Sequence, residues 1–231
     1  MLKNAILTDT SEVAGAIAQH TLARREAQDA SEVRRLVDAG LDVMRTCGTA
    51  ASPRVADIVA AAGLSNDAFY RHFASKEALV AAILEDGSAR LSSYLGHQMA
   101  KVSTPPDKVR CFVEGVMSQA ADEDIAATTR AVLWNGGTLS VRLGSRRTSP
   151  AASLAPLLRD PFAQLGSTSP DADAMLVAHA AVATLSDLLW QHVRPTRATI
   201  DHFVEFCLAA VTSRPSSAPT AKPVYHGEGN R

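Results

Sequence analysis

Residues 63–80 read GLSNDAFYRHFASKEALV, and the first eleven of them collect an unusual set of side chains. They include a glycine, a serine of the type that caps helices, three aromatic rings, an arginine and a histidine, in a chain whose aromatic content is only 5%. Two explanations stand. The ends of two packed helices meet here, or these side chains face a partner outside the protein that is flat and negatively charged.

Sequence motifs of enzymes are missing from the chain. It has no G-x-G-x-x-G, Walker loop, H-E-x-x-H or G-x-S-x-G. The seven histidines are scattered, and His179, His192 and His202 could form a metal site only through long-range folding, so we interpret them as structural. We therefore predict that the protein is not an enzyme and has no catalytic residue, cofactor or metal site.

The three cysteines, Cys47, Cys111 and Cys207, are far apart and form no C-x-x-C pair. Their number and spacing argue against a disulfide framework and fit a reducing cytosol. Cys111 and Cys207 fall on apolar helix faces, where an inert buried thiol is the usual case. A redox-sensing regulator that uses one of these two thiols is kept as an alternative.

Composition describes a soluble protein of one large domain or two smaller ones, with 231 residues, 46% of them hydrophobic. The net charge is −1, so a nucleic-acid partner would have to be recognised by a local patch. The N-terminus MLKNAILTDT is not a convincing signal peptide, and the apolar run VAHAAVATLSDLL is interrupted by His179 and Asp187. We predict a cytoplasmic protein with no membrane partner.

Helical periodicity runs through nearly the whole chain, and strand signals are lacking, so we predict an all-α fold. Within 33–47, apolar residues recur at i, i+3, i+4 and i+7. A second helix is expected to begin at Ser52-Pro53 and to end at Gly63. Ser65 should cap a short third helix, and Ser75 a long fourth one. A helix, a glycine turn and a short second helix form a helix-turn-helix, whose second helix enters the DNA major groove.

Residues 33–96 resemble the DNA-binding domain of the tetracycline-repressor (TetR) family of bacterial transcription regulators. The matching residues are the first helix ending at Cys47-Gly48, then VADIVAAAGLS, then AFYRHFASKEAL. The run FYRHF followed by Ser-Lys-Glu is far more specific than a helix-turn-helix pattern alone. The remainder of the chain matches only in being helical and of suitable length.

The resemblance implies a set of DNA-binding residues: Arg54, Ser65, Asn66, Asp67, Tyr70, Arg71, His72 and Lys76. Phe69 and Phe73 would form the core of the small domain. Tyr70 and His72, expected on the exposed sides of the recognition helix, would contact phosphates. Arg71 could reach a phosphate or a guanine edge.

Two cations and the leading end of the recognition helix complete the implied interface. Lys76 and Arg54 would pair with the DNA backbone. Asn66 suits adenine, and Asp67 can accept from the cytosine amino group, although an acidic residue here departs from the family and could simply favour the helix N-terminus. Residues 31–76 hold six Lys/Arg and five Asp/Glu, so binding should be strongly salt-sensitive.

We expect four parts along the chain: an N-terminal extension at 1–30, a DNA-binding domain at 31–78, a helical ligand-binding and dimerisation domain at 79–213 and a disordered tail at 214–231. The role of 1–30 is open, and its helical character is weak. In the third part, one helix should start at Thr104-Pro105 and another should run from Asp122 to Trp134 and stop at Asn135-Gly136-Gly137. Prolines should keep the helices of 138–168 short. Two long helices are expected at 171–193 and 196–213.

The resemblance further implies a homodimer built by the last two helices, and a ligand cavity in the helical domain. Candidate dimer residues are Ala174, Ala178, Ala181, Phe203 and Cys207, and candidate pocket residues are Phe112, Met117, Trp134, His179 and Trp190. Each of these is more often plain core when taken singly.

These observations lead to one function. We predict a ligand-responsive DNA-binding regulator, a repressor that binds a palindromic double-stranded operator as a dimer and is released by a hydrophobic small molecule. The alternatives are a helical small-molecule-binding or scaffold protein that does not bind DNA, and the redox-sensing regulator.

Overall fold

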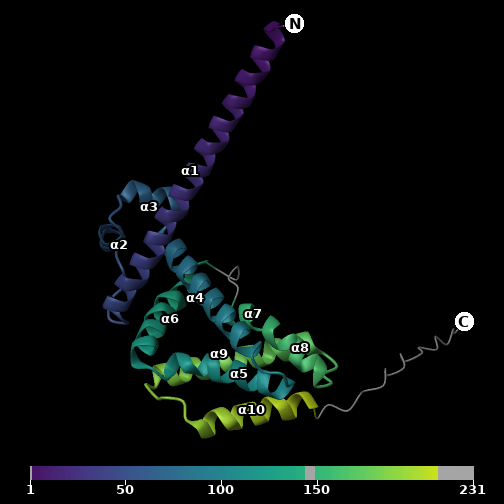
Figure 1. Cartoon of the computed structure of the whole chain (residues 1–231). Helices are drawn as coiled ribbons and strands as arrows, with labels where there is room; N and C mark the ends of the chain where they lie inside the picture. The colour runs from purple at the N-terminus through teal and green to yellow at the C-terminus, as the bar shows by residue number, and fades with distance from the viewer. Residues whose placement is uncertain (1, 144–148, 213–231) are drawn as a thin grey trace, which may run out of the picture. The chain divides into compact units, whose positions relative to one another are not determined.

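A computed structural model describes residues 2–143 and 149–212, and their side chains at 14–136 and 149–211 (Figure 1). Within these ranges every regular element is a helix, which confirms the predicted all-α fold. The predicted tail at 214–231 lies outside the described residues. The elements are α1 (Leu2–Cys47), α2 (Val55–Ala62), α3 (Asn66–His72), α4 (Lys76–Met99), α5 (Pro105–Met117), η1 (Ser118–Ala120), α6 (Glu123–Leu143), α7 (Pro150–Leu154), α8 (Pro156–Gln164), α9 (Pro170–Trp190) and α10 (Arg197–Thr212).

The chain divides into two compact units. The first consists of Met1–Ala89 with Asp122–Thr148, and the second of Arg90–Ala121 with Ser149–Arg231. Because α4 crosses from one unit to the other, the first unit holds α1 to α3, the beginning of α4, and α6. The expected domain limits at 30/31 and 78/79 remain predictions.

The core of the first unit is formed where the apolar faces of α1, α2, α3 and α4 meet. The fully buried side chains are Leu36, Met44, Ile58, Phe69 and Leu79. Burying one such side chain contributes about 1.5–3 kcal/mol, so this cluster fixes α2, α3 and the beginning of α4 against α1. The apolar spacing predicted for 33–47 and for the second and third helices is confirmed.

The first helix is much longer than the segment 33–47, since α1 is continuous from Leu2. The expected N-terminal extension is therefore a direct prolongation of the core helix. Its described side chains at 14–31 are all exposed. For the side chains at 14–31 the lack of a place in the core agrees with the sequence analysis, whereas the helix, expected to be weak there, is continuous with the core segment.

The start of α2 was predicted wrongly. The helix begins at Val55, its N-cap is Arg54 in an extended conformation, and no side chain caps it. Ser52 is used differently, because its hydroxyl accepts a hydrogen bond from Lys76 Nζ at 2.9 Å. The capping assignments for the other helices are confirmed: Ser75 Oγ accepts from the N–H of Ala78 at 3.2 Å at the start of α4, and Thr104 caps α5.

The predicted stop at Asn135-Gly136-Gly137 is also wrong, because α6 continues to Leu143. Asn135 Nδ2 donates to the carbonyl of Ala131 at 2.8 Å, one turn earlier in the same helix. At Gly136 a Cβ atom would lie 2.5 Å from Leu84 Cδ1. The glycine therefore permits close approach of α4 and α6 and does not terminate the helix.

The second unit packs α5 and α7–α10 around a core of its own. Its fully buried large side chains include Phe112, Leu158, Phe162 and Leu189. The helices α7 and α8 are short, as predicted for 138–168, and the two long helices α9 and α10 are confirmed with ends at Trp190 and Thr212.

Within residues 2–143 and 149–212, one helix, α9, is long and apolar enough to cross a membrane by length and composition alone. The side that carries Ala174, Ala178 and Ala181 is buried within the second unit. A single helix of this kind is weak evidence for a membrane span.

Candidate nucleic-acid interface

The short helix α3 is held by two aromatic side chains on its inner side. Phe69 is fully buried, Phe73 is 8% exposed, and their ring centroids lie 5.9 Å apart. The rings of Tyr70 and Phe69 form a T-shaped pair with centroids 5.2 Å apart, yet Tyr70 remains 58% exposed. The structure thus places Phe69 and Phe73 in the core, as predicted, and leaves the outer side of α3 open to solvent.

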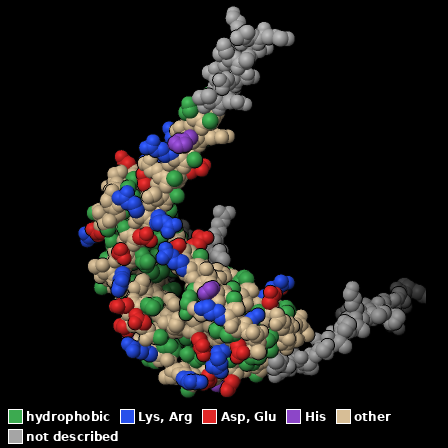
Figure 2. All heavy atoms as spheres, viewed as in Figure 1, with side chains coloured by type: hydrophobic (Ala, Val, Ile, Leu, Met, Phe, Trp, Pro, Cys, Tyr) green, Lys and Arg blue, Asp and Glu red, His purple; other side chains and the backbone are tan. Residues whose placement is uncertain are grey.

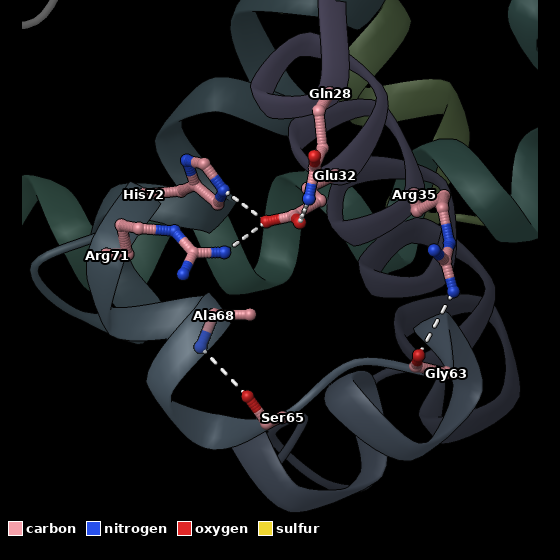
Figure 3. Close-up of polar contacts among 8 residues, drawn as sticks. All are labelled: Gln28, Glu32, Arg35, Gly63, Ser65, Ala68, Arg71 and His72. Atoms are coloured by element: carbon pink, nitrogen blue, oxygen red, sulfur yellow. Dashed lines mark hydrogen bonds and ion pairs between the residues drawn. The ribbon is translucent and has the colours of Figure 1, made fainter. Parts of the chain in front are cut away.

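The turn between α2 and α3 is defined by a glycine and a serine. Gly63 has φ +61°, the left-handed conformation that favours glycine, and it ends α2 as predicted. Ser65 Oγ accepts a hydrogen bond from the N–H of Ala68 at 3.1 Å and caps α3 (Figure 3). These two residues fix the angle at which α3 leaves α2.

The helix α1 holds this turn through an arginine that sequence reasoning did not single out. The Arg35 guanidinium donates to the carbonyls of Ala62 and Gly63, the latter at 3.1 Å (Figure 3). These are carbonyls at the end of α2, which lack partners within the helix. Since the partners lie 27 and 28 positions along the chain, no local pattern reveals this contact.

A second contact from α1 reaches the other end of α3. The carboxylate of Glu32 accepts hydrogen bonds from His72 Nε2 at 2.8 Å, from Arg71, and from Gln28 at 3.2 Å (Figure 3). The hydrogen bonds from His72, Arg71 and Gln28 lower the pKa of Glu32 from 4.5 to about 2. The carboxylate therefore stays charged at neutral pH and ties the last turn of α3 to α1.

The expected exposure of His72 is wrong. Its side chain is only 8% exposed, because the imidazole is turned inward to Glu32. The side chain of Arg71 is 55% exposed although it pairs with the same carboxylate. Tyr70 and Arg71 are therefore accessible to a partner outside the protein, whereas His72 acts inside the domain.

The remaining predicted contact residues lie on the outer side of the first unit. Arg54, Ser65, Asn66 and Asp67 are exposed, the last three at the leading end of α3. Lys76, at the start of α4, is partly buried, with its ammonium group bonded to Ser52. The structure thus brings together amide, carboxylate, phenol and guanidinium groups along one short helix, a set able to bond base edges and phosphates.

Three potential metal ligands gather beside α3. Atoms of Asp29, Glu32 and His72 lie within 4.8 Å of one another. However, the Arg71 guanidinium is bonded to the same oxygen of Glu32 as the imidazole. A fixed positive charge on that oxygen opposes a metal ion, so the group is better described as an ion-pair cluster.

The predicted pocket residues do not share one environment. Phe112 and Met117 are buried in the core of the second unit. Trp134 and Trp190 are 45% and 42% exposed, and His179 is exposed as well. A shared apolar lining made of these five side chains remains a prediction.

The alanine stripe predicted for the dimer interface needs correction. Ala174, Ala178 and Ala181 are buried within a single chain, so a second copy could not contact them. Cys207 is likewise 1% exposed, and Phe203 is partly buried. Small residues on α9 serve close packing inside the second unit.

The two thiols considered for redox sensing are poorly suited to it. Burial raises the pKa of Cys207 to about 12. The pKa of Cys111 is also raised, mainly by burial and then by the charge of Glu114. Since the thiolate is the reactive form, both side chains are of the inert kind.

Comparison with known proteins agrees with this geometry. Residues 36–83 match the family model described as bacterial regulatory proteins, tetR family. No curated protein matches the chain. A TetR transcriptional regulator from Rhodococcus sp. RHA1 is similar in structure, with 14% identity, coverage of 82% of this chain and 99% of that one, and a TM-score of 0.56.

Two further solved structures share the fold. A TetR-family regulator from Mesorhizobium loti has 16% identity, covers 80% of this chain and 96% of its own, and has a TM-score of 0.54. The regulator FadR from Bacillus subtilis, solved in complex with stearoyl-CoA, has 13% identity, covers 78% and 97%, and has a TM-score of 0.52. Residues 36–83 are thus similar to the helix-turn-helix domain of the tetR family, and the chain shares the all-helical fold of these regulators.

Proposed function

We propose that the protein is a transcriptional regulator that binds operator DNA through α3. The observation that carries this proposal is the arrangement of α3 itself, whose inner side is locked by Phe69 and Glu32 and whose outer side offers Asn66, Tyr70 and Arg71. A short helix that is held rigidly at both ends, with polar side chains outward, can enter the major groove without a further loss of conformational entropy.

Phosphate contacts would come from the flanks of α3. The Tyr70 hydroxyl and the cations Arg54 and Lys76 are candidates, and Arg71 could exchange Glu32 for a phosphate or a guanine edge. Because the segment is nearly neutral overall, its affinity would depend on these positions and would fall steeply with salt.

We also propose that two copies form the active species. The second unit exposes apolar side chains on α9, α10 and the turn between them, namely Met175, Leu176, Trp190, Val193 and Phe206. Leu176 and Phe206 are each 63% exposed, which is costly for large side chains that no partner covers. These exposed side chains replace the buried alanine stripe as candidates for the dimer surface. A dimer would present two copies of α3 about 34 Å apart, one turn of DNA.

An apolar or amphipathic small molecule is the proposed effector, supported by the stearoyl-CoA bound to the related FadR. It would bind more tightly to the form of the dimer whose recognition helices are misplaced for the operator, and the coupling free energy equals that difference in affinity.

The test of the DNA-binding surface is the double variant Tyr70→Ala with Lys76→Ala. Its matched control is Tyr94→Ala with Lys101→Ala, which removes an exposed tyrosine and lysine outside the helix-turn-helix. Fluorescence anisotropy on a selected duplex should show a large loss of DNA affinity for the first variant only. The helical content and the oligomeric state of both variants should equal those of the wild type. Equal affinity for the two variants would contradict the proposal and favour a helical protein that does not bind DNA.

A further inference from the structure

Residues 14–31 of α1 prolong a core helix beyond the core of the first unit (Figure 1). All of their side chains are exposed, with Ile17 at 62% and Leu22 at 58%. A helical segment without packing is marginal in water, and its usual stabilisation is the burial of one face. The direction in which each face points therefore indicates what could cover it.

One face of this helix is continuous with the contacts to the helix-turn-helix. The side chains that share it recur every three or four residues and include no carboxylate: Ile17, Thr21, Arg24, Gln28, Ser31 and Arg35. Its last members point to the helix-turn-helix, since Gln28 bonds Glu32, which holds Arg71, and Arg35 bonds Gly63 (Figure 3). The earlier members lie on that same side of α1.

Two arginines lie on this side of the extension, together with the carboxylate of Asp29, which is one turn beyond Arg25 and close to Glu32. Arg24 lies on the face just described, and Arg25 begins the neighbouring row that leads to Glu32. Among the described side chains, neither arginine is bonded to another residue. Glu26 follows Arg24 by two positions, about 200° around the helix, and so lies on the far side. Figure 2 shows both blue and red side chains on the part of α1 that leads away from the core.

We propose that residues 14–31 bind the phosphate backbone of DNA that flanks the operator half-site, with Arg24 and Arg25 as the principal contacts. The proposal rests on the proposed function, because α3 must first occupy its groove. At 1.5 Å per residue, Arg24 lies about 12 Å along the helix from Glu32, which touches the end of α3. The eighteen residues 14–31 span roughly 27 Å, the length of about eight base pairs.

Phosphate explains this face better than a second copy of the helix. A two-stranded coiled coil needs apolar residues at most a and d positions. Here Ile17 is followed on the same face by Thr21, Arg24 and Gln28. Hydroxyl, guanidinium and amide groups are donors that suit an anionic backbone.

The test compares the full-length protein with two variants of the extension. Arg24→Ala with Arg25→Ala removes the proposed contacts, and Glu26→Gln changes a charge on the opposite side as the matched control. Each is titrated by fluorescence anisotropy onto two duplexes, the selected operator alone and the same operator with eight added base pairs on either side. Titrations run from 50 to 200 mM salt.

The wild type should bind the longer duplex more tightly, and the double arginine variant should lose that gain. For the double arginine variant on the long duplex, the slope of log affinity against log salt should be less steep by about 2 for each bound copy. Raising the salt from 50 to 200 mM should therefore weaken its binding roughly tenfold less, for each copy, than it weakens binding of the wild type. Glu26→Gln should retain both properties.

Two results would overturn the inference alone: wild-type affinity that does not depend on the flanks, or an arginine variant with the wild-type salt slope. Suppose instead that the arginine variant differs from the wild type in the molar mass of its assembly in solution but still binds the longer duplex more tightly. That result would likewise overturn the inference and favour self-association. Failure of the wild type to bind either duplex would instead remove the proposed function, and this inference with it.

Discussion

The left-handed glycine that ends α2 permits a sharp test of how the recognition helix is positioned. Gly63 has φ +61°, and a Cβ atom there would lie 3.0 Å from an Arg35 Nη atom. Gly48, which follows α1, has nearly the same φ, +58°, but nothing lies within 4 Å of its Cβ position. Gly63→Ala and Gly48→Ala therefore share the backbone strain and differ in the contact with Arg35.

The magnitudes follow from these two terms. A left-handed conformation costs a residue other than glycine about 1–2 kcal/mol. Replacing glycine by alanine also lowers the conformational entropy of the unfolded chain, which offsets about 0.4–1 kcal/mol of that cost. Gly48→Ala should therefore lower the free energy of unfolding by about 1 kcal/mol. Gly63→Ala should lower it by about 2 kcal/mol, because displacing Arg35 also weakens two hydrogen bonds from a charged donor that is exposed.

Urea unfolding followed by circular dichroism measures both values at one protein concentration. The difference of about 1 kcal/mol between the two variants is assigned to Arg35, so it should vanish when both are made in an Arg35→Ala background. The reasoning is refuted if Gly63→Ala and Gly48→Ala are equally stable in the wild-type background. Wild-type stability of both variants would refute the strain argument itself.

Three other predictions concern packing, pH and thiol reactivity. Gly115→Ala should lower the free energy of unfolding by about 1–3 kcal/mol, because its Cβ would lie 2.2 Å from the fully buried side chain of Leu95. Gly87→Ala, in a helix with open space around it, should be neutral or up to about 1 kcal/mol stabilising, and urea unfolding that ranks the pair otherwise contradicts the packing. The lowered pKa of Glu32, about 2, means that its bonds stabilise the fold fully above pH 4.5 and are lost as the pH falls through 2. The stability difference between wild type and Glu32→Gln should thus shrink as the pH falls from 4.5 to 2, and a difference that instead grows over that range would show the wrong sign. Cys207, with a pKa of about 12, should resist a thiol reagent at pH 8 until urea unfolds the chain, and rapid labelling of the native protein, located by mass spectrometry, would reopen the redox-sensing alternative.

Local signals predicted the architecture around α3 well. Gly63 and Ser65 act through the backbone of their own neighbours, so their roles as helix end and helix cap are readable from residue type and position. Phe69 and Phe73, four positions apart on one helix face, are buried for the same local reason.

Where sequence reasoning failed, a distant residue decided the outcome. The residue types of Asn135-Gly136 predict the end of a helix, but α6 continues through them. Gly136 is needed instead because Leu84 of α4 packs where a Cβ atom would lie. The resemblance to the family placed His72 on the exposed side of α3, but its imidazole points inward because it bonds to Glu32, forty residues earlier in the chain. The stripe of Ala174, Ala178 and Ala181 predicts a close contact between helices, and the structure buries it within one chain. Its spacing alone could not show whether the contacting helix belongs to the same chain or to a second copy.

The central claim is that α3 of this protein reads a specific DNA sequence. The most direct measurement is selection from a pool of random duplexes at near-physiological salt, with full-length protein that has been unfolded in urea and refolded to release any bound small molecule. We expect enrichment of a two-fold-symmetric site whose half-sites are centred about 10 base pairs apart. A refolded, dimeric protein that enriches no sequence would contradict it.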